Sequence, residues 1–225
     1  MWSVVIPFKG TSNSKSRFGS GDNSGLAIAM ALDTVWAALA ADGVDEVIVV
    51  TSAGEAFLHT GAIVVADPLA DQNAGLSAAI DAGLAAVGVS THAKPTDPAA
   101  APNPSAPRDL ALGRNRAVLL GDIPALRPAE LSAALTEALG HPLAIVADSE
   151  GTGTTLATAT AGHRHLLAFG PGSRLAHAAA GYVEISGDWP GLSRDVDTQS
   201  HLDALARARM LGEHTLAYRQ LNAPT

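Results

Sequence analysis

The segment AVLLGDIPAL, Ala117 to Leu126, decides the fold because a buried apolar run ends in it at one acidic residue. Ala117 to Leu120 is almost continuously apolar, and such a run is typical of a strand that is covered on both faces, as in a parallel sheet. Pro124 prevents the strand from continuing, so we expect Asp122 to emerge at its carboxyl end. Functional groups collect at the carboxyl ends of parallel strands, which makes Asp122 the first candidate site residue.

Similar runs and the stretches between them predict an α/β protein. Four further runs predict buried strands: Ser3 to Ile6, Glu46 to Val50, Ala62 to Ala66 and Leu143 to Val146. Longer Ala- and Leu-rich stretches between the runs predict helices: Leu26 to Leu39, Leu76 to Val87 and Pro128 to Leu139. This alternation indicates a mostly parallel central sheet with helices on both faces.

The second half of the chain is more polar, and we expect it to form a short antiparallel extension of the sheet. Its predicted strands are Thr154 to Thr160, Leu166 to Phe169 and Tyr182 to Ile185, and a small helix is expected from Ser173 to Ala180. A single C-terminal helix is predicted from Thr198 to Leu211, capped by Asp197 or Thr198.

Composition limits the protein to a few classes. The 225 residues carry a formal net charge of -8 and include no cysteine, which fits one domain over residues 1–225 and excludes disulfides and thiolate metal sites. The acidic balance argues against a nucleic-acid surface. No apolar run reaches the roughly 20 residues of a membrane span, and the N-terminal residues lack a secretory signal pattern, so we expect a cytoplasmic protein.

Residues 91–116 form a Pro- and Ala-rich segment with five prolines between Pro95 and Pro107. This composition cannot form a regular element, and it predicts a disordered insertion. A loop of this length can also be functional, and that alternative stays open.

The loop after the first predicted strand, Pro7 to Arg17, concentrates cations in a chain that has only three lysines. Lys9, Lys15 and Arg17 lie there among Ser, Gly and Asn, a chemistry that suits phosphate oxygens. The spacing is not that of a Walker A loop. A solvated surface loop is the alternative.

Three aspartates are candidate metal ligands. Asp122 follows a buried strand, and Asp195 and Asp197 are spaced to lie on one side of an extended segment, where they repel each other unless a cation lies between them. Carboxylates of this kind hold Mg²⁺, which leaves its other positions to phosphate and water. The alternatives are that Asp122 caps a turn and that Asp197 caps a helix.

Two glycine-rich segments, Asp148 to Thr155 and Phe169 to Arg174, offer backbone N–H groups and hydroxyls to anions. Simple turns are the alternative. Beside the cationic loop and the aspartates, they favour a site that handles more than one phosphate group. The eight histidines show no zinc spacing and are expected at the surface. No Ser nucleophile elbow and no dinucleotide-binding glycine pattern is present.

In their order along the chain, these motifs resemble the guanylyltransferase family that makes the phosphodiester precursor of the deazaflavin coenzyme F-420. The resemblance covers Pro7, Lys9, Lys15, Ser16, Arg17, Gly75 to Ala79, Gly121 to Leu126, Gly151 to Thr155, Phe169 to Ser173 and Arg194 to Thr198. It implies a single Rossmann-like nucleotidyltransferase domain of the kind seen in molybdenum-cofactor guanylyltransferases.

The resemblance also implies a role for individual residues. Metal falls to Asp122, Asp195 and Asp197, and catalysis to Lys15, Arg17 and Asp122. GTP falls to Lys9, Lys15, Gly75, Leu76 and Ser77, where the family usually has Asn in place of Ser77. Phosphoenolpyruvate falls to Thr155, Gly170 and Ser173.

The implied reaction transfers GMP from GTP to phosphoenolpyruvate or 2-phospho-L-lactate, with one or two Mg²⁺ ions and release of pyrophosphate. The product would pass to a downstream transferase. An ionised acceptor phosphate needs no protein nucleophile, so positioning and charge neutralisation do most of the work. Two alternatives remain: another acceptor, such as molybdopterin, a sugar phosphate or 3-phosphoglycerate, and a non-catalytic nucleotide-binding module.

Overall fold

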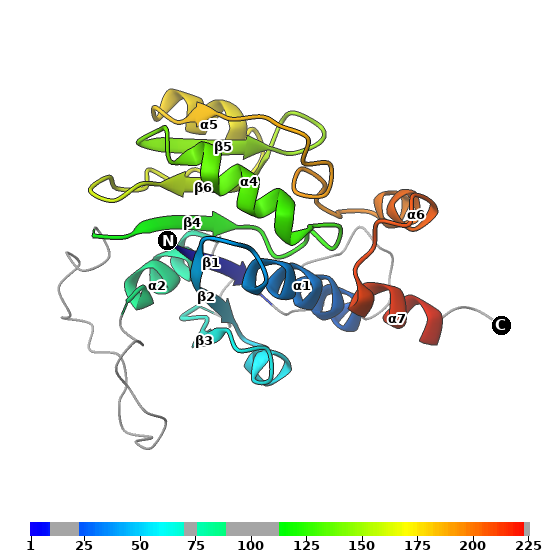
Figure 1. The fold of residues 1–225 in the computed structure, drawn as a ribbon. Helices are drawn as coiled ribbons and strands as arrows, with labels where there is room; N and C mark the ends of the chain where they lie inside the picture. The colour runs from blue at the N-terminus through cyan, green and yellow to red at the C-terminus, as the bar shows by residue number, and fades with distance from the viewer. Residues whose placement is uncertain (10–22, 70–75, 89–112, 223–225) are drawn as a thin grey trace, which may run out of the picture.

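A computed structural model describes residues 1–9, 23–69, 76–88 and 113–222 (Figure 1). In these residues one seven-stranded sheet has the order β3-β2-β1-β4-β6-β5-β7. The strands are β1 (Trp2–Phe8), β2 (Val44–Thr51), β3 (Ile63–Ala66), β4 (Asn115–Leu119), β5 (Leu143–Ala147), β6 (Thr154–Ala159) and β7 (Val183–Glu184). Every described pairing is parallel apart from the two that β6 makes with β4 and β5. The predicted fold class is confirmed, and its antiparallel part is a strand inside the sheet.

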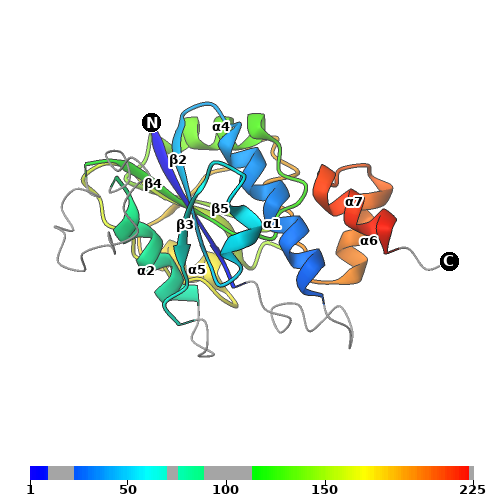
Figure 2. The same cartoon turned by 90° about the horizontal axis from the view of Figure 1, so that it is seen from below.

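Helices cover both faces of the sheet (Figures 1 and 2). They are α1 (Ser24–Leu39), α2 (Leu76–Ala86), α4 (Pro128–Ala138), α5 (Ser173–Ala179), α6 (Gln199–Arg207) and α7 (Glu213–Leu221), with a short 3-10 helix, η2 (Gly54–Phe57). Alternation along β1 explains the layers, because Val4 and Ile6 pack in the core beneath α1 and α4 while Val5 packs against α2. None of the described helices has the length and apolar character needed to span a membrane.

The predicted strand from Leu166 to Phe169 is wrong, because this segment has no strand pairing. Its backbone N–H groups bond to side chains instead of to a neighbouring strand. The backbone N–H of Leu166 donates to the Tyr182 hydroxyl at 3.0 Å, and that of Ala168 donates to Nε2 of His177 at 3.0 Å. The segment thus stays extended beside the sheet without joining it.

The predicted C-terminal helix is two helices. α6 ends at Arg207, and two residues later Arg209 lies in the left-handed region at φ 55°. The N–H groups of Arg209 and Met210 donate to the carbonyls of Ala206 and Leu205, respectively, which closes the end of the helix. Glycine usually occupies that position, so the sequence carries no obvious stop signal. At its other end α6 is capped by Thr198, as predicted, whose hydroxyl accepts from the His201 N–H at 3.3 Å.

The first turn of α7 is capped by a residue of α1. Asp33 is buried, and its carboxylate accepts from the N–H groups of His214 at 2.8 Å and Thr215 at 2.9 Å. The residue before the helix, Gly212, has no side chain to cap with, and a Cβ there would lie 2.3 Å from Cγ of Asp33. Asp33 therefore attaches the C-terminal helices to the central domain.

The Pro- and Ala-rich segment was predicted to run over residues 91–116, but Asn115 and Arg116 already belong to β4. Most of the segment, up to residue 112, lies outside the described residues. The segment joins the end of α2 to the start of β4, at the amino ends of the parallel strands.

Candidate functional site

The carboxyl ends of β1 and β4 form one wall of a cavity of about 270 Å³. Lys9 follows β1, Asp122 follows β4, and Leu76, which also lines the cavity, begins α2. The lining comprises Pro7, Phe8, Lys9, Ala27, Met30, Leu76, Leu120, Gly121 and Asp122. The structure therefore brings three of the predicted site residues, Lys9, Leu76 and Asp122, to one cavity with otherwise mostly apolar walls.

The backbone around Asp122 is held from two sides. On α1, the buried hydroxyl of Thr34 lies 3.4 Å from the Gly121 carbonyl and accepts from the Ile123 N–H at 3.3 Å. On the other side, the Val196 N–H donates to the Asp122 carbonyl at 2.9 Å. Sequence reasoning missed Thr34, and its one signal is a hydroxyl that follows Asp33 in a mostly apolar helix.

Asp195 lies among other carboxylates. Its burial, together with the negative charges of Asp122, Asp197 and Asp148, raises the pKa of Asp195 to about 7. Asp195 is thus close enough to Asp122 and Asp197 to interact with their charges, and Asp148 is a further acid near it that had not been assigned to metal. A cation among them would remove the repulsion that raises this pKa.

In the part of the chain that the structure describes, no group of three or more His, Asp or Glu side chains is arranged to hold a metal ion. Mg²⁺ commonly takes only one or two protein carboxylates and completes its shell with phosphate oxygens and water. The donors here therefore suit an ion that arrives with a nucleotide better than one held by protein ligands alone.

The glycine-rich segment after β5 is a loop closed by Asp148. Its carboxylate accepts from the N–H groups of Thr152 at 2.9 Å and Gly153 at 2.7 Å. A Cβ at Gly153 would lie 2.4 Å from Oδ2 of Asp148. This glycine therefore leaves room for the carboxylate, which supports the turn alternative at this position.

The residues predicted to hold the acceptor do not share one open surface. Thr155 is fully buried and its hydroxyl lies 3.5 Å from the Val146 carbonyl. Ser173 is buried, with its hydroxyl donating to Oγ1 of Thr154 at 3.3 Å and its N–H donating to the Gly170 carbonyl at 3.0 Å. Gly170 is exposed. Both hydroxyls are thus engaged inside the protein.

His177 corrects the expectation that every histidine lies at the surface. It is fully buried, with Nε2 accepting from the Ala168 N–H and Nδ1 lying 3.0 Å from Oγ1 of Thr154. Burial lowers the pKa of His177, so the ring is neutral and Nδ1 carries the proton that Thr154 accepts. His177 therefore connects the segment before α5 to β6, and spacing along the sequence carried no signal for this role.

The remaining predicted residues are not brought into the cavity by the described part of the chain. Lys15, Arg17 and Gly75 lie outside the described residues. Ser77 is exposed on the first turn of α2 and does not line the cavity, whereas its neighbour Leu76 does.

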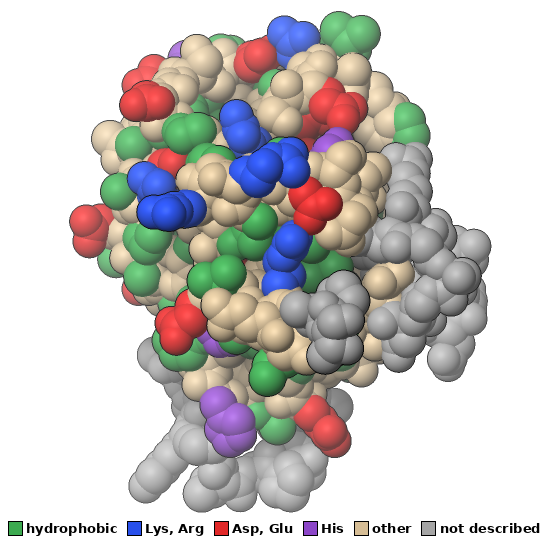
Figure 3. Space-filling model, turned by 90° about the vertical axis from the view of Figure 1, so that its right-hand side faces the viewer, with side chains coloured by type: hydrophobic (Ala, Val, Ile, Leu, Met, Phe, Trp, Pro, Cys, Tyr) green, Lys and Arg blue, Asp and Glu red, His purple; other side chains and the backbone are tan. Residues whose placement is uncertain are grey.

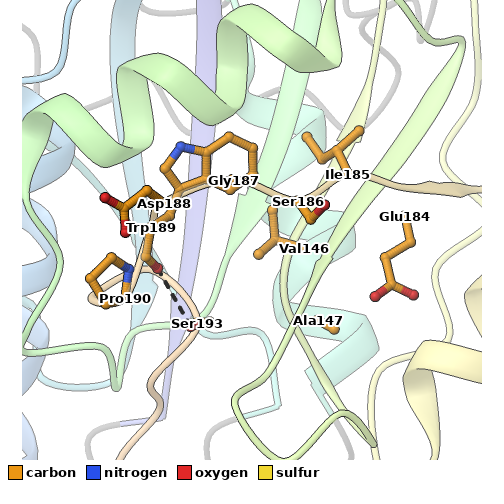
Figure 4. A pocket seen from close by; sticks show the side chains of 10 residues that line it. All are labelled: Val146, Ala147, Glu184, Ile185, Ser186, Gly187, Asp188, Trp189, Pro190 and Ser193. Carbon is orange, nitrogen blue, oxygen red and sulfur yellow. Dashed lines mark hydrogen bonds between the residues drawn. The ribbon is translucent and has the colours of Figure 1, made fainter.

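A second cavity, of about 260 Å³, lies beside the ends of β5 and β7 (Figure 4). Trp189 and Asp188 lie on one side of it and Glu184 on the other, with Val146 and Ile185 between them. None of these residues carries a signal in the sequence that predicts a site.

Charge is unevenly distributed over the surface. Figure 3 shows Lys and Arg side chains in the middle of the face toward which β4 points, with Asp and Glu side chains among and around them.

Comparison with known proteins identifies close relatives. No family model matches the chain. It is 40% identical to a phosphoenolpyruvate guanylyltransferase of Frankia casuarinae, with 94% of this chain and 73% of that protein covered. It is also 40% identical to one of Geodermatophilus obscurus, covering 96% of this chain and 93% of that one, and 39% identical to one of Streptomyces coelicolor, covering 96% and 94%. A solved 4-diphosphocytidyl-2C-methyl-D-erythritol synthase shares the fold, with a TM-score of 0.53 at 15% identity over 91% of this chain and 96% of that one.

Proposed function

The chain belongs to the phosphoenolpyruvate guanylyltransferase family, and we propose that it transfers GMP from GTP to phosphoenolpyruvate with release of pyrophosphate. Relatives of this name cover almost the whole chain at about 40% identity. The observation that carries the proposal is the cavity at the ends of β1 and β4. A cation, Lys9, and an acid, Asp122, line this cavity, whose other walls are mostly apolar. Asp195 lies close enough to interact with Asp122.

The proposed reaction is a direct transfer of GMP between the two substrates and needs no covalent enzyme intermediate. A phosphate oxygen of phosphoenolpyruvate attacks the α-phosphorus of GTP in line, the bond to the β-phosphate oxygen breaks, and pyrophosphate leaves with the electron pair. The acceptor oxygen is already ionised near neutral pH, so no general base has to remove a proton. The protein orients two polyanions and neutralises their charge.

Positive charge at the site comes from protein and metal. Lys9 on the cavity wall, with Lys15 and Arg17 from the following loop, neutralises the triphosphate and the pyrophosphate that departs. Asp122, Asp195 and Asp197 would hold one or two Mg²⁺ ions together with phosphate oxygens of the nucleotide. When bound, Mg²⁺ neutralises the α-phosphate and the leaving group.

The two substrates occupy different parts of the carboxyl edge of the sheet. Gly75, Leu76 and Ser77 contact the guanine, and the apolar side chain of Leu76 on the cavity wall supports this placement. Thr155, Gly170 and Ser173 hold phosphoenolpyruvate, and of the three Gly170 is exposed. The product, enolpyruvyl-diphospho-guanosine, passes to a downstream transferase of coenzyme F-420 biosynthesis in the cytoplasm.

The test is a substrate matrix. The enzyme is incubated with Mg²⁺, each of the four ribonucleoside triphosphates, and phosphoenolpyruvate, 2-phospho-L-lactate or 3-phosphoglycerate, and pyrophosphate release is followed. We expect the highest kcat/KM with GTP and phosphoenolpyruvate. Transfer to a different acceptor and not to phosphoenolpyruvate would contradict the proposed substrate. GTP binding without turnover on any acceptor would contradict the proposal that the protein is an enzyme.

A further inference from the structure

The segment that carries Asp195 and Asp197 has little regular structure of its own. It connects β7, which ends at Glu184, to α6, which begins at Gln199. Carboxylates that must share a cation need a fixed separation, and a connecting segment does not provide it unless other elements hold it in place. The question is therefore what anchors this segment beside Asp122.

Glu130, in the first turn of α4, makes the anchoring contacts. It is 7% exposed, and its two carboxylate oxygens accept from the N–H groups of Gly191 at 3.2 Å and Leu192 at 3.0 Å. Among the described residues, no cationic side chain forms an ion pair with Glu130. Two backbone donors thus compensate for the burial of this charge.

The turn at Gly191 fits tightly against Glu130 and the loop that follows Asp122. A Cβ at Gly191 would lie 2.1 Å from the carbonyl oxygen of Ala125 and 2.5 Å from Oε2 of Glu130. The Arg194 N–H donates to the Gly191 carbonyl at 3.3 Å, which closes the turn one residue before Asp195.

Beyond the turn, Val196 joins the segment to the loop of Asp122. Its side chain is fully buried, and its N–H donates to the Asp122 carbonyl at 2.9 Å. Asp195 and Asp197 flank this anchor. The positions of both acids relative to Asp122 therefore depend on the turn that Glu130 holds and on one backbone hydrogen bond.

We propose that Glu130 is a positioning residue, whose buried carboxylate holds the Gly191–Leu192 turn so that Asp195 and Asp197 lie beside Asp122 for a divalent cation. Its catalytic consequence rests on the proposed function, whereas its effect on the turn and on metal binding does not. Sequence analysis assigned no role to Glu130.

The test compares Glu130→Gln with Glu137→Gln, a change on the same helix at an exposed position. In Glu130→Gln the amide NH₂ faces one of the two N–H donors, so one hydrogen bond to a charged group is lost while side-chain volume is kept. Glu130→Asp keeps the charge but shortens the side chain, and it serves as a second variant that retains a carboxylate.

Three measurements on the full chain read out the role. Hydrogen exchange follows the amides of residues 189–197, Mn²⁺ titration in the presence of GTP gives metal affinity, and steady-state rates give the Mg²⁺ concentration for half-maximal activity. For Glu130→Gln we expect about tenfold faster exchange at Gly191 and Leu192 and about tenfold weaker metal binding. The KM for phosphoenolpyruvate and the values for Glu137→Gln should stay at the wild-type level.

Each outcome bears on the proposal. Faster exchange with unchanged metal binding would make Glu130 a turn anchor only and overturn the positioning role, as would wild-type values in both measurements. Weaker metal binding in Glu130→Gln, recovered in part by Glu130→Asp, would support it. If the wild-type enzyme fails to transfer GMP to any acceptor, the exchange and Mn²⁺ measurements still decide the role of Glu130.

Discussion

The two halves of the candidate site treat their polar groups in opposite ways. At the ends of β1 and β4, Lys9 and Asp122 line a cavity, and Asp195 lies among other carboxylates that raise its pKa. Around α5, the hydroxyls of Thr155 and Ser173 are buried and bond to neighbouring protein groups.

The difference follows from the chemistry of the side chains. A hydroxyl both donates and accepts, so a set of hydroxyls and a histidine can satisfy one another inside the protein. Ionised carboxylates only accept, and their mutual repulsion favours an external cation. The β1–β4 half is therefore organised toward a ligand, whereas the α5 half is organised toward itself.

Removing a charge from the β1–β4 half should cost the most activity. Asp122→Asn replaces a carboxylate on the cavity wall with a neutral amide, and we expect turnover to fall by about 100-fold, the order of loss seen when one preorganised electrostatic contact is deleted. Pyrophosphate release at saturating GTP and phosphoenolpyruvate measures it, with the exposed Asp42→Asn as control. Equal rates in the two variants would remove Asp122 from the site.

A smaller effect is expected from the α5 half. Ser173→Ala removes one hydroxyl, and Thr155→Val replaces another with a methyl group of similar size. Because a hydrogen bond to a charged group contributes roughly 1.5–3 kcal/mol, we expect at least about tenfold weaker binding of phosphoenolpyruvate. GTP affinity should not change. Calorimetric titration with each ligand separates the cases, and equal losses for both ligands would indicate general destabilisation instead of an acceptor contact.

The α5 half should also make the stability of the protein sensitive to acid, because His165 lies beside it. Burial and the charge of Arg116 lower the pKa of His165 to about 3, from 6.5. The unfolded chain therefore binds more protons than the folded one between pH 6.5 and 3, and the free energy of unfolding decreases as the pH falls through this window. Urea unfolding at pH 7 and pH 5 should show this loss, and His165→Gln should make it smaller. A loss of the same size in the variant would assign the acid sensitivity to other groups.

The smallest effect is expected from a change that leaves both halves in place. Deleting residues 94–107 shortens the connection between α2 and β4 at the edge of the sheet opposite the cavity. Loop closure costs only about 0.6 kcal/mol per doubling of length, so the free energy of unfolding and kcat/KM should hardly change. Chemical denaturation and the transfer assay measure this, and a large loss in either would give the segment a structural or functional role.

The sheet and the position of Asp122 at its carboxyl edge could be predicted because their signals are local. Continuous apolar runs mark the parallel strands, and an acid directly after such a run, as at Asp122, is placed at the carboxyl edge by topology alone. The shared cation that the spacing of Asp195 and Asp197 indicates stays a prediction.

The parts that could not be predicted depend on contacts between distant residues. His177 lies on an exposed, Ala-rich helix, and its burial is decided by Thr154 and Ala168. The break after α6 was missed because Arg209 occupies a position where glycine is the usual signal. In the sequence, Glu130 is an acid in the first turn of a helix, and only the contact with the distant Gly191 shows its role.

The antiparallel strand β6 also affects the order in which strands can pair while the chain is synthesised on the ribosome. β5 and β6 form a hairpin closed by the loop of Asp148, and β6 is the neighbour that connects this hairpin to β4. Until residue 159 has been translated, β4 lacks one of its two neighbours, and an unpaired edge is a template for association with other chains. The hairpin closes over a short sequence distance and can form as soon as it emerges, whereas pairing across to β4 spans a longer one. Slow translation of residues 148–159 would therefore prolong the exposure of β4 in the nascent chain, at the joint between the two halves of the site.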